Sequence, residues 1–290
     1  MLTIVEPGAQ RVILRTAPAT QAIVSWNTRA PSGTIEIAVY RSDGQVSSWL
    51  PYVRFSPRER RSLDGQDEVA RIATDIIRSP VEIVAVEVRA DVPLDAVAVS
   101  TPRYAPIAPP PPAPPPLAVP LRSQYVADQP SERGWCSPAA LAMLLAFWGI
   151  ELGVAEIAAR VRDESYGGTG NWAFNTALAG ALGLRGTVAH LRDLAHAAHF
   201  IDAGIPVALS FAWKVAELPG APVEHSDGHL AVLCGFTERR DPIVNDPAQP
   251  GVATTYNQTA FERAWRTHGA IAYLVAPPAR SDELVQIANR

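Results

Sequence analysis

Short stretches of the first hundred residues alternate between apolar and polar side chains. The clearest is Thr34–Tyr40, in which every second position is isoleucine or valine and turn-forming residues stand on both sides. Similar short runs occur at 11–14, 22–26, 81–88 and 96–99. No convincing helix-length periodicity separates them, so this part of the chain predicts a β-sandwich of about a hundred residues.

The pattern changes after residue 120 to a mixture of helices and strands. Residues 138–148 are apolar on almost every side, which predicts a helix buried all round, with Pro138 near its start and Gly149 at its end. Two further helices and four strands are expected, at 154–162, 175–183, 206–211, 229–235, 242–245 and 270–275. A buried helix followed by an antiparallel sheet indicates an α+β domain.

A proline-rich stretch separates these two patterns. Most of the residues from Ala108 to Leu117 are proline, which favours extended polyproline geometry. We therefore expect a semi-rigid spacer that keeps two separately folding domains apart. The expected division is a β-sandwich at 1–103, a linker at 104–118, the α+β domain at 119–278 and a C-terminal tail at 279–290.

Composition excludes several classes of function. The 29 acidic and 25 basic residues give a net charge of -4, and no lysine or arginine run would attract nucleic acid. No stretch is long enough to span a bilayer, and the first residues lack the basic and apolar pattern of an export signal. The default expectation is a cytoplasmic protein, with an extracellular location left open.

Cys136 is a candidate nucleophile. The chain contains only Cys136 and Cys234, which excludes a disulfide framework. Cys136 stands directly before the predicted buried helix, where unpaired N–H groups and the helix dipole stabilise a thiolate. Free cysteines are more often small buried hydrophobic residues, and Cys234, in the middle of an apolar strand, is expected to be one.

His229 is the candidate general base, and Asp246 is the candidate that orients it. His229 begins a predicted strand, and Asp246 follows 17 residues later, after a second strand. If the two strands form a hairpin that turns near 237–239, the numbers of cross-strand partners sum to about 475. His229 and Asp246 would then lie opposite each other, where a carboxylate can orient an imidazole and stabilise its cation.

The other histidines give no signal for a metal or cofactor site, and none is expected. His190, His196 and His199 surround an alanine-rich stretch without cysteine or carboxylate at ligand spacing, and we expect them on the surface. His225 lies four residues before His229, but in a loop that does not favour a metal pair.

Taken in order, these motifs resemble the bacteriocin-processing-like (double-glycine leader peptidase-like) cysteine peptidases of the papain-like superfamily. The resemblance covers about residues 119–277 and rests on 122–124, 134–139, 228–230 and 244–247. It implies a papain-like fold for 119–278 and a Cys-His-Asp triad of Cys136, His229 and Asp246. It also implies an upstream glutamine that helps to form the oxyanion hole.

The sequence departs from the common family pattern at two places. Papain-like enzymes usually place the glutamine about six residues before the nucleophile, but residue 130 is proline. Gln124 fits the lead-in motif and is preferred, whereas Gln129 is nearer in spacing. Ser137 replaces the usual glycine after the nucleophile, which should not impair chemistry because that residue contributes mainly its backbone.

The resemblance favours a cysteine peptidase that hydrolyses a peptide or isopeptide bond of a peptide or protein substrate. The alternatives are an acyltransferase that uses the same acyl-enzyme and a catalytically inactive binding protein. The N-terminal domain contains no Cys/His arrangement and no pair of carboxylates that could catalyse a reaction, so binding is its expected role. Trp26, Trp49 and Tyr52 are candidates for contacts with a carbohydrate or surface ligand.

Overall fold

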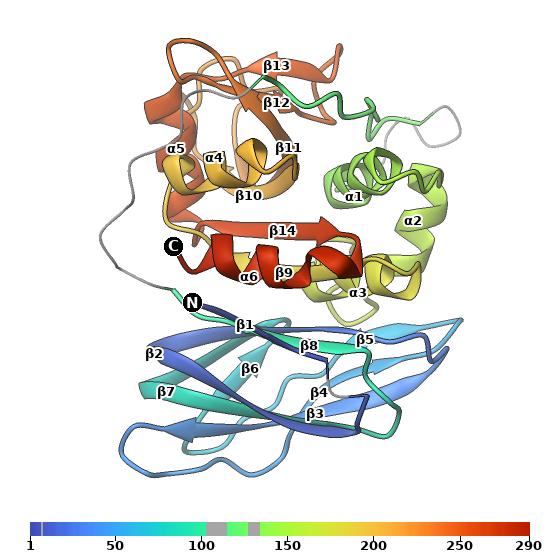
Figure 1. The fold of residues 1–290 in the computed structure, drawn as a ribbon, viewed down its shortest axis with the longest axis vertical. Helices are drawn as coiled ribbons and strands as arrows, with labels where there is room; N and C mark the ends of the chain where they lie inside the picture. The colour runs from blue at the N-terminus through green and yellow to red at the C-terminus, as the bar shows by residue number, and fades with distance from the viewer. Residues whose placement is uncertain (7, 103–114, 127–133) are drawn as a thin grey trace.

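The computed structural model describes residues 1–6, 8–102, 115–126 and 134–290, which form two antiparallel sheets and six α-helices (Figure 1). The N-terminal sheet has the order β1-β8-β2-β7-β3-β4-β5, and β6 pairs with β7. Its strands are β1 (Leu2–Val5), β2 (Arg11–Asn27), β3 (Gly33–Arg41), β4 (Leu50–Phe55), β5 (Arg60–Ser62), β6 (Arg71–Ala73), β7 (Ile76–Ala90) and β8 (Ala96–Ser100).

The strands predicted for the first hundred residues are present, but two of them are parts of one long strand. Residues 11–14 and 22–26 both belong to β2, whose register against β7 shifts between Arg15 and Gln21. Such irregularities bend a strand and increase its twist. The eight strands form one hydrogen-bonded sheet, so the predicted sandwich of two sheets is not confirmed.

The second sheet contains six strands in the order β13-β12-β11-β10-β14-β9, which confirms the predicted mixture of helices and strands. The helices of this half are α1 (Cys136–Phe147), α2 (Val154–Val161), α3 (Trp172–Ala181), α4 (Leu194–Asp202), α5 (Gln258–Thr267) and α6 (Ser281–Ala288). The strands are β9 (Arg185–His190), β10 (Val207–Trp213), β11 (Ser226–Phe236), β12 (Pro242–Asn245), β13 (Ala253–Thr255) and β14 (Ile271–Ala276).

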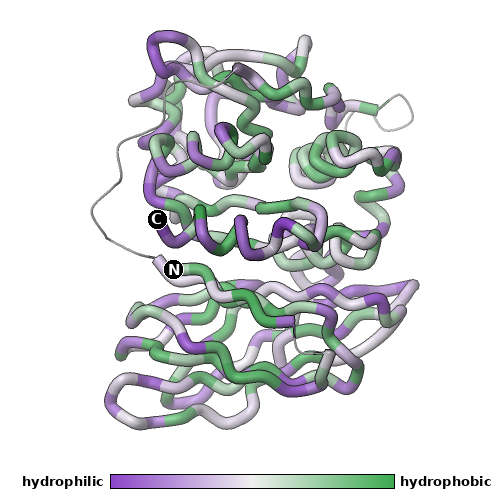
Figure 2. Tube along the Cα trace, viewed as in Figure 1, coloured by the Kyte–Doolittle hydropathy of each residue, from purple (hydrophilic) through white to green (hydrophobic). Residues whose placement is uncertain are grey.

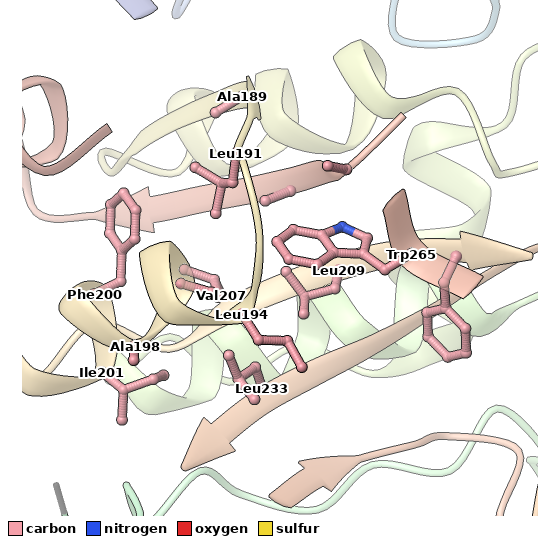
Figure 3. Close-up of a cluster of buried hydrophobic side chains, with 14 of the residues drawn as sticks. Ala189, Leu191, Leu194, Ala198, Phe200, Ile201, Val207, Leu209, Leu233 and Trp265 are labelled. Carbon is pink, nitrogen blue, oxygen red and sulfur yellow. The ribbon is translucent and has the colours of Figure 1, made fainter. Parts of the chain in front are cut away.

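Both faces of the second sheet are covered. One face joins α4 and α5 in a cluster that includes Leu209, Leu233 and Trp265 (Figure 3). The opposite face packs with α1 and α2 through residues such as Val232 and Tyr273. Burial on two sides explains why these strands are apolar at nearly every position rather than at every second one.

Helix α1 is enclosed almost completely, as its sequence predicts. All residues from Cys136 to Leu145 are buried, and α1 ends before Gly149, whose φ of 81° is left-handed. Figure 2 shows that apolar stretches run through α1 and through strands of both sheets. The first residue of this helix, Cys136, therefore lies inside the protein rather than on its surface.

The two sheets are in direct contact, so the expectation of domains held apart by a spacer is wrong. Asn27 of β2 donates to the Gly186 carbonyl of β9 at 2.9 Å and accepts from Arg185 at 3.1 Å, all in buried positions. Figure 1 shows α3 on the side of the C-terminal half that faces the N-terminal sheet. The proline pattern predicts local stiffness, but it carries no information on how the flanking units pack. Most of that spacer, at 103–114, lies outside the described residues.

An apolar contact strengthens this interface. Phe174 of α3 belongs to the core of the N-terminal sheet and meets Trp26 edge-on, with ring centroids 5.7 Å apart. The core of the N-terminal sheet is thus completed by a helix from the other half of the chain. This shared core joins the two halves into one packed unit.

Two of the three aromatic residues named as candidates for ligand contacts are not available for that role. Trp26 is 2 % exposed and Tyr52 is fully buried, so both belong to the core. The guanidinium groups of Arg11 and Arg89 cover Trp49, at 5.5 and 4.2 Å from its ring centre. The expectation was wrong because an alternating strand does not reveal which of its faces the rest of the protein covers.

The expected C-terminal tail is a helix that packs against both halves of the chain. Asn289, directly after α6, donates to the Leu2 carbonyl at 2.7 Å. His196 Nε2 lies 2.8 Å from the Ile287 carbonyl of α6. None of the helices in the described ranges has the length and apolar composition needed to cross a membrane.

Replacing Phe174 with alanine should lower the free energy of unfolding of the whole chain by about 3–5 kcal/mol, because it opens a cavity in the shared core. Chemical denaturation followed by circular dichroism measures this change. The control Phe147→Ala, at a half-buried ring, should cost less. Two independent unfolding transitions, of which Phe174→Ala moves only one, would contradict the shared core.

Candidate active site

The thiol of Cys136 is held at the start of α1, where it is 8 % exposed. Gly134 has a left-handed φ of 97°, and the chain enters the helix from this residue. The N–H groups of a first helical turn have no partner within the helix, so they can stabilise negative charge there. Burial acts to raise the pKa of the thiol, but the charge and hydrogen bond of His229 outweigh it, and the pKa is lowered.

Aromatic side chains enclose His229, which is 6 % exposed. His229 on β11 pairs across the sheet with Phe211 of β10. The rings of Phe211 and Trp213 approach the imidazole edge-on, with centroids at 5.3 and 5.6 Å. These contacts fix the plane of the imidazole and keep water away from it.

Asp246 lies directly after β12, is fully buried and meets His229. Its Oδ1 is 2.7 Å from His229 Nε2 and also accepts from the Ala248 N–H at 2.9 Å. Its Oδ2 accepts a hydrogen bond from the Tyr256 hydroxyl at 2.7 Å. Burial acts to raise the pKa of this carboxyl, but His229 and the hydrogen bonds outweigh it and keep the pKa below its ordinary value.

The charges of the three groups support one another. Burial acts to lower the pKa of His229, but Asp246 and the Cys136 thiolate favour the protonated ring and raise its pKa to about 10. Because Nε2 faces Asp246, Nδ1 is the ring nitrogen that remains for an interaction with the Cys136 thiol. The arrangement therefore favours a thiolate–imidazolium pair, which is a nucleophile together with a proton donor.

The hairpin brings His229 and Asp246 together in a register that differs from the expected one. Val232 pairs with Asn245, so partner numbers sum to 477 rather than 475, and an irregularity follows between Leu233 and Gly235. A shift of two keeps every side chain on its face, because strand side chains alternate with a period of two. Extending the register makes Asp246 the diagonal rather than the direct neighbour of His229.

Gln124 lies beside Asp246 in space. Its main-chain N–H donates to the carbonyl of Pro247 at 3.0 Å, and the residue is 6 % exposed. The side-chain oxygen is buried and has no hydrogen-bond partner among the residues that the structure describes. Among the described residues, the side-chain amide of Gln124 therefore has no structural hydrogen bond through its oxygen. The alternative, Gln129, lies outside the described residues.

Several residues that shape the site escaped the sequence analysis. Phe211, Trp213 and Tyr256 fix the His229–Asp246 pair, and the Thr169 hydroxyl donates to the Gly134 carbonyl at 2.7 Å. Only a known strand pairing could have placed Phe211 opposite His229. The Ser137 hydroxyl lies 2.8 Å from that of Tyr273 in the core, so the serine that replaces glycine points away from the site.

The remaining cysteine and histidines lie apart from this site. Cys234 is buried on β11, which raises the pKa of its thiol to about 12. His190 and His196 are buried rather than on the surface, and burial lowers their pKa values to about 3 and about 4. His190 lies between the sheets, with its Nε2 at 3.2 Å from Gln21. Among the described residues, no group of three His, Cys, Asp or Glu side chains is arranged to hold a metal ion.

Comparison with known proteins finds two family models along the chain. The model described as the Peptidase_C39 like family matches residues 116–273, and the model described as the Peptidase C39 N-terminal domain matches residues 10–104. These matches confirm the family expected from the motifs. No curated protein matches the chain.

Two solved structures are similar to part of the chain. A putative C39-like peptidase from Bacillus anthracis is 17% identical with a TM-score of 0.43, and the match covers 55% of this chain and 94% of that one. A double glycine motif protease from an AMS/PCAT transporter, in complex with the leader peptide, is 18% identical with a TM-score of 0.38, covering 56% and 94%.

Iodoacetamide should alkylate Cys136 rapidly at a pH where an ordinary thiol is protonated, since the pKa of its thiol is lowered. The rate should fall only as the pH drops through that lowered pKa, because the thiolate is the reactive form. Mass spectrometry of protein labelled at about pH 5 to 9 measures this profile.

Cys234 serves as the internal control for this experiment. It should stay unlabelled in the folded protein, because it is buried and its pKa is raised. Cys234→Ala should leave the labelling rate of Cys136 unchanged. Equal and slow labelling of both thiols would show that the site does not activate Cys136.

Proposed function

Because the chain belongs to the Peptidase_C39 like family, we propose that it is a cysteine peptidase that hydrolyses a peptide or isopeptide bond through an acyl-enzyme on Cys136. The observation that carries the proposal is the buried 2.7 Å contact between His229 and Asp246, next to a thiol whose pKa that histidine lowers. Acyl transfer by a cysteine enzyme uses a nucleophile, a base that exchanges protons with it and a carboxylate that orients the base, and Cys136, His229 and Asp246 can take these roles.

In the proposed mechanism, the Cys136 thiolate attacks the carbonyl carbon of the scissile bond. The developing oxyanion is bound by the Cys136 N–H, which has no partner within α1, and by the side-chain amide of Gln124. The His229 imidazolium protonates the leaving amine, and a thioester remains on Cys136. His229 then takes a proton from water as the water oxygen attacks the thioester, and the acid is released while the Cys136 sulfur leaves as the thiolate, which restores the thiolate–imidazolium pair.

The buried surroundings of His229 support its double role. A general acid and base has to present the same nitrogen to the leaving group and then to water. The bond from Nε2 to Asp246 and the rings of Phe211 and Trp213 hold Nδ1 toward Cys136 in both steps. Asp246 is itself held by Tyr256, so the orientation does not depend on a mobile carboxylate.

Incubation with a peptide library, followed by mass spectrometry of the products, tests the proposed reaction. The whole protein should release free carboxylic acids, and Cys136→Ala should release none. Adding a competing amine should leave the products unchanged if the enzyme is a hydrolase. Amine adducts as the main products would instead identify an acyltransferase, and no product despite a reactive Cys136 would contradict both.

Asp246→Asn should lower kcat by at least about tenfold, because the neutral amide neither fixes the imidazole tautomer nor stabilises the imidazolium. The decrease is measured with the peptide substrate found above. Tyr256→Phe should lower kcat less, since it removes one of the bonds that hold the carboxylate.

Asn245→Ala is the neighbouring control. The amide of Asn245 donates to the Val119 carbonyl at 3.1 Å rather than to the site. Its loss should therefore reduce stability without lowering kcat. A greater loss of kcat in Asn245→Ala than in Asp246→Asn would contradict the assignment of Asp246.

Gln124→Ala should reduce kcat roughly a hundredfold or more with little change in KM, because the amide binds charge that develops only in the transition state. The matched control is Gln129→Ala, which should leave kcat near that of the unmodified enzyme. Normal turnover in Gln124→Ala together with a large loss in Gln129→Ala would transfer the oxyanion role to Gln129.

A further inference from the structure

The segment that follows α2 and ends at the first residue of α3, residues 163–172, is here called the 163–172 loop and is organised around the carboxylate of Asp163, which is fully buried. Its Oδ1 accepts from the N–H groups of Ser165 and Tyr166 at 3.0 and 3.3 Å. Its Oδ2 accepts from the side chain of Asn171 at 2.9 Å, and Asn171 caps the start of α3. One carboxylate therefore ties the two ends of the 163–172 loop together.

The N-terminal sheet holds the beginning of this loop. The N–H of Ser62 at the end of β5 also donates to Asp163 Oδ1, at 3.0 Å. Next to it, the N–H of Glu164 donates to the Arg60 carbonyl of β5 at 2.9 Å. Asp163 thus belongs to the C-terminal half of the chain, but one of its bonds comes from the N-terminal sheet.

The N-terminal sheet also holds the end of the loop. Asp75, between β6 and β7, accepts from the Trp172 N–H at the start of α3 at 2.8 Å. Burial raises the pKa of Asp75 to about 7, although the hydrogen bonds to its carboxyl act to lower it. The sheet therefore keeps a buried carboxyl at this contact at a cost in stability.

The 163–172 loop contacts the backbone that leads into Cys136. Thr169 donates from its hydroxyl to the Gly134 carbonyl at 2.7 Å. Gly134 has a left-handed φ and lies before the first hydrogen-bonded turn of α1, so the helix does not fix its orientation. The bond from Thr169 fixes it instead, and with it the direction of the peptide groups that reach Cys136.

Packing alone does not fix the position of the loop. A hollow of about 440 Å³ is lined by residues 62–64 together with Ser165 and Tyr166, and Tyr166 is 55% exposed. Because one side of the loop is open, the hydrogen bonds of Asp163 rather than close packing determine where the loop lies.

We propose that the N-terminal sheet is a positioning element of the catalytic centre. Through Asp163 it holds the 163–172 loop, and through Thr169 the loop fixes Gly134 and the Cys136 N–H of the oxyanion hole. The inference rests on the proposed peptidase function. It gives the N-terminal half a role in turnover itself rather than in the attachment of a separate ligand.

Asp163→Asn and Thr169→Val test the two links with changes that preserve side-chain volume. An asparagine at position 163 has one oxygen and one NH₂ group. Depending on its orientation, the NH₂ group either faces the side-chain donor of Asn171 or replaces the acceptor for the Ser62 N–H. A valine at position 169 has no hydroxyl to donate to the Gly134 carbonyl. Both variants should lower kcat by about tenfold or more, because small displacements of reacting groups are costly, while KM changes little. The pH profile of Cys136 alkylation should stay unchanged, because the thiol pKa is set by burial and by the opposing effect of His229, and His229 lies outside the loop.

Asn27→Ala is the control for general destabilisation, because Asn27 bridges the same two halves but does not contact the 163–172 loop. It should lower the melting temperature and leave kcat unchanged at temperatures where the protein is folded. Normal kcat in both loop variants, or an equal loss of kcat in Asn27→Ala, would overturn the positioning role. Absence of hydrolysis by the unmodified protein would overturn the peptidase function and the positioning role together, so the two failures can be distinguished.

Discussion

An α-helix with no polar face has to be covered on every side, and the rest of this fold follows from how α1 meets that requirement. The second sheet covers one side of α1, and α2 and α3 supply Ile157 and Leu178 to the same cluster. Helix α3 also has apolar residues that do not face α1. Among them, Phe174 packs in the core of the N-terminal sheet. Burial of apolar surface thus links the second sheet, the helices around α1 and the N-terminal sheet, and α3 makes the connection to the N-terminal sheet.

The same constraint creates the chemistry of the site. Because α1 is enclosed, its first residue is enclosed too, and a thiol in such a place would ordinarily resist ionisation. The protein offsets this effect with a second buried charge, His229, and a third, Asp246, whose oxygens are bound by Ala248 and Tyr256. Each group is costly to bury alone, but His229 favours the ionised forms of Cys136 and Asp246, and both favour its protonated form, so the arrangement favours a thiolate that is shielded from bulk water.

The N-terminal sheet does not contribute a member of the Cys136–His229–Asp246 group, but it contacts the segments around that group. Asn27 and Phe174 join the two halves through buried contacts. Ser62 and Asp75 act closer to Cys136, because they hold the loop that contacts Gly134. A change in the N-terminal sheet is therefore expected to reach the backbone at Gly134 and Cys136 by a short series of hydrogen bonds, without altering the pKa of the thiol.

Local patterns in the sequence were enough to predict strands within β2, β3, β7 and β8, the buried helix α1 and the pairing of His229 with Asp246 on one sheet face. The strands depend on a period of 2 residues and the buried helix on an unbroken apolar run, and the chain displays both directly. The exact register could not be read from the sequence, because the partner sum of 477 differs from the expected 475 by two, which leaves every side chain on its face. Which faces are covered, whether Trp26 is exposed and how Ser62 meets Asp163 were decided only in the tertiary structure, since they depend on contacts between residues far apart in the chain.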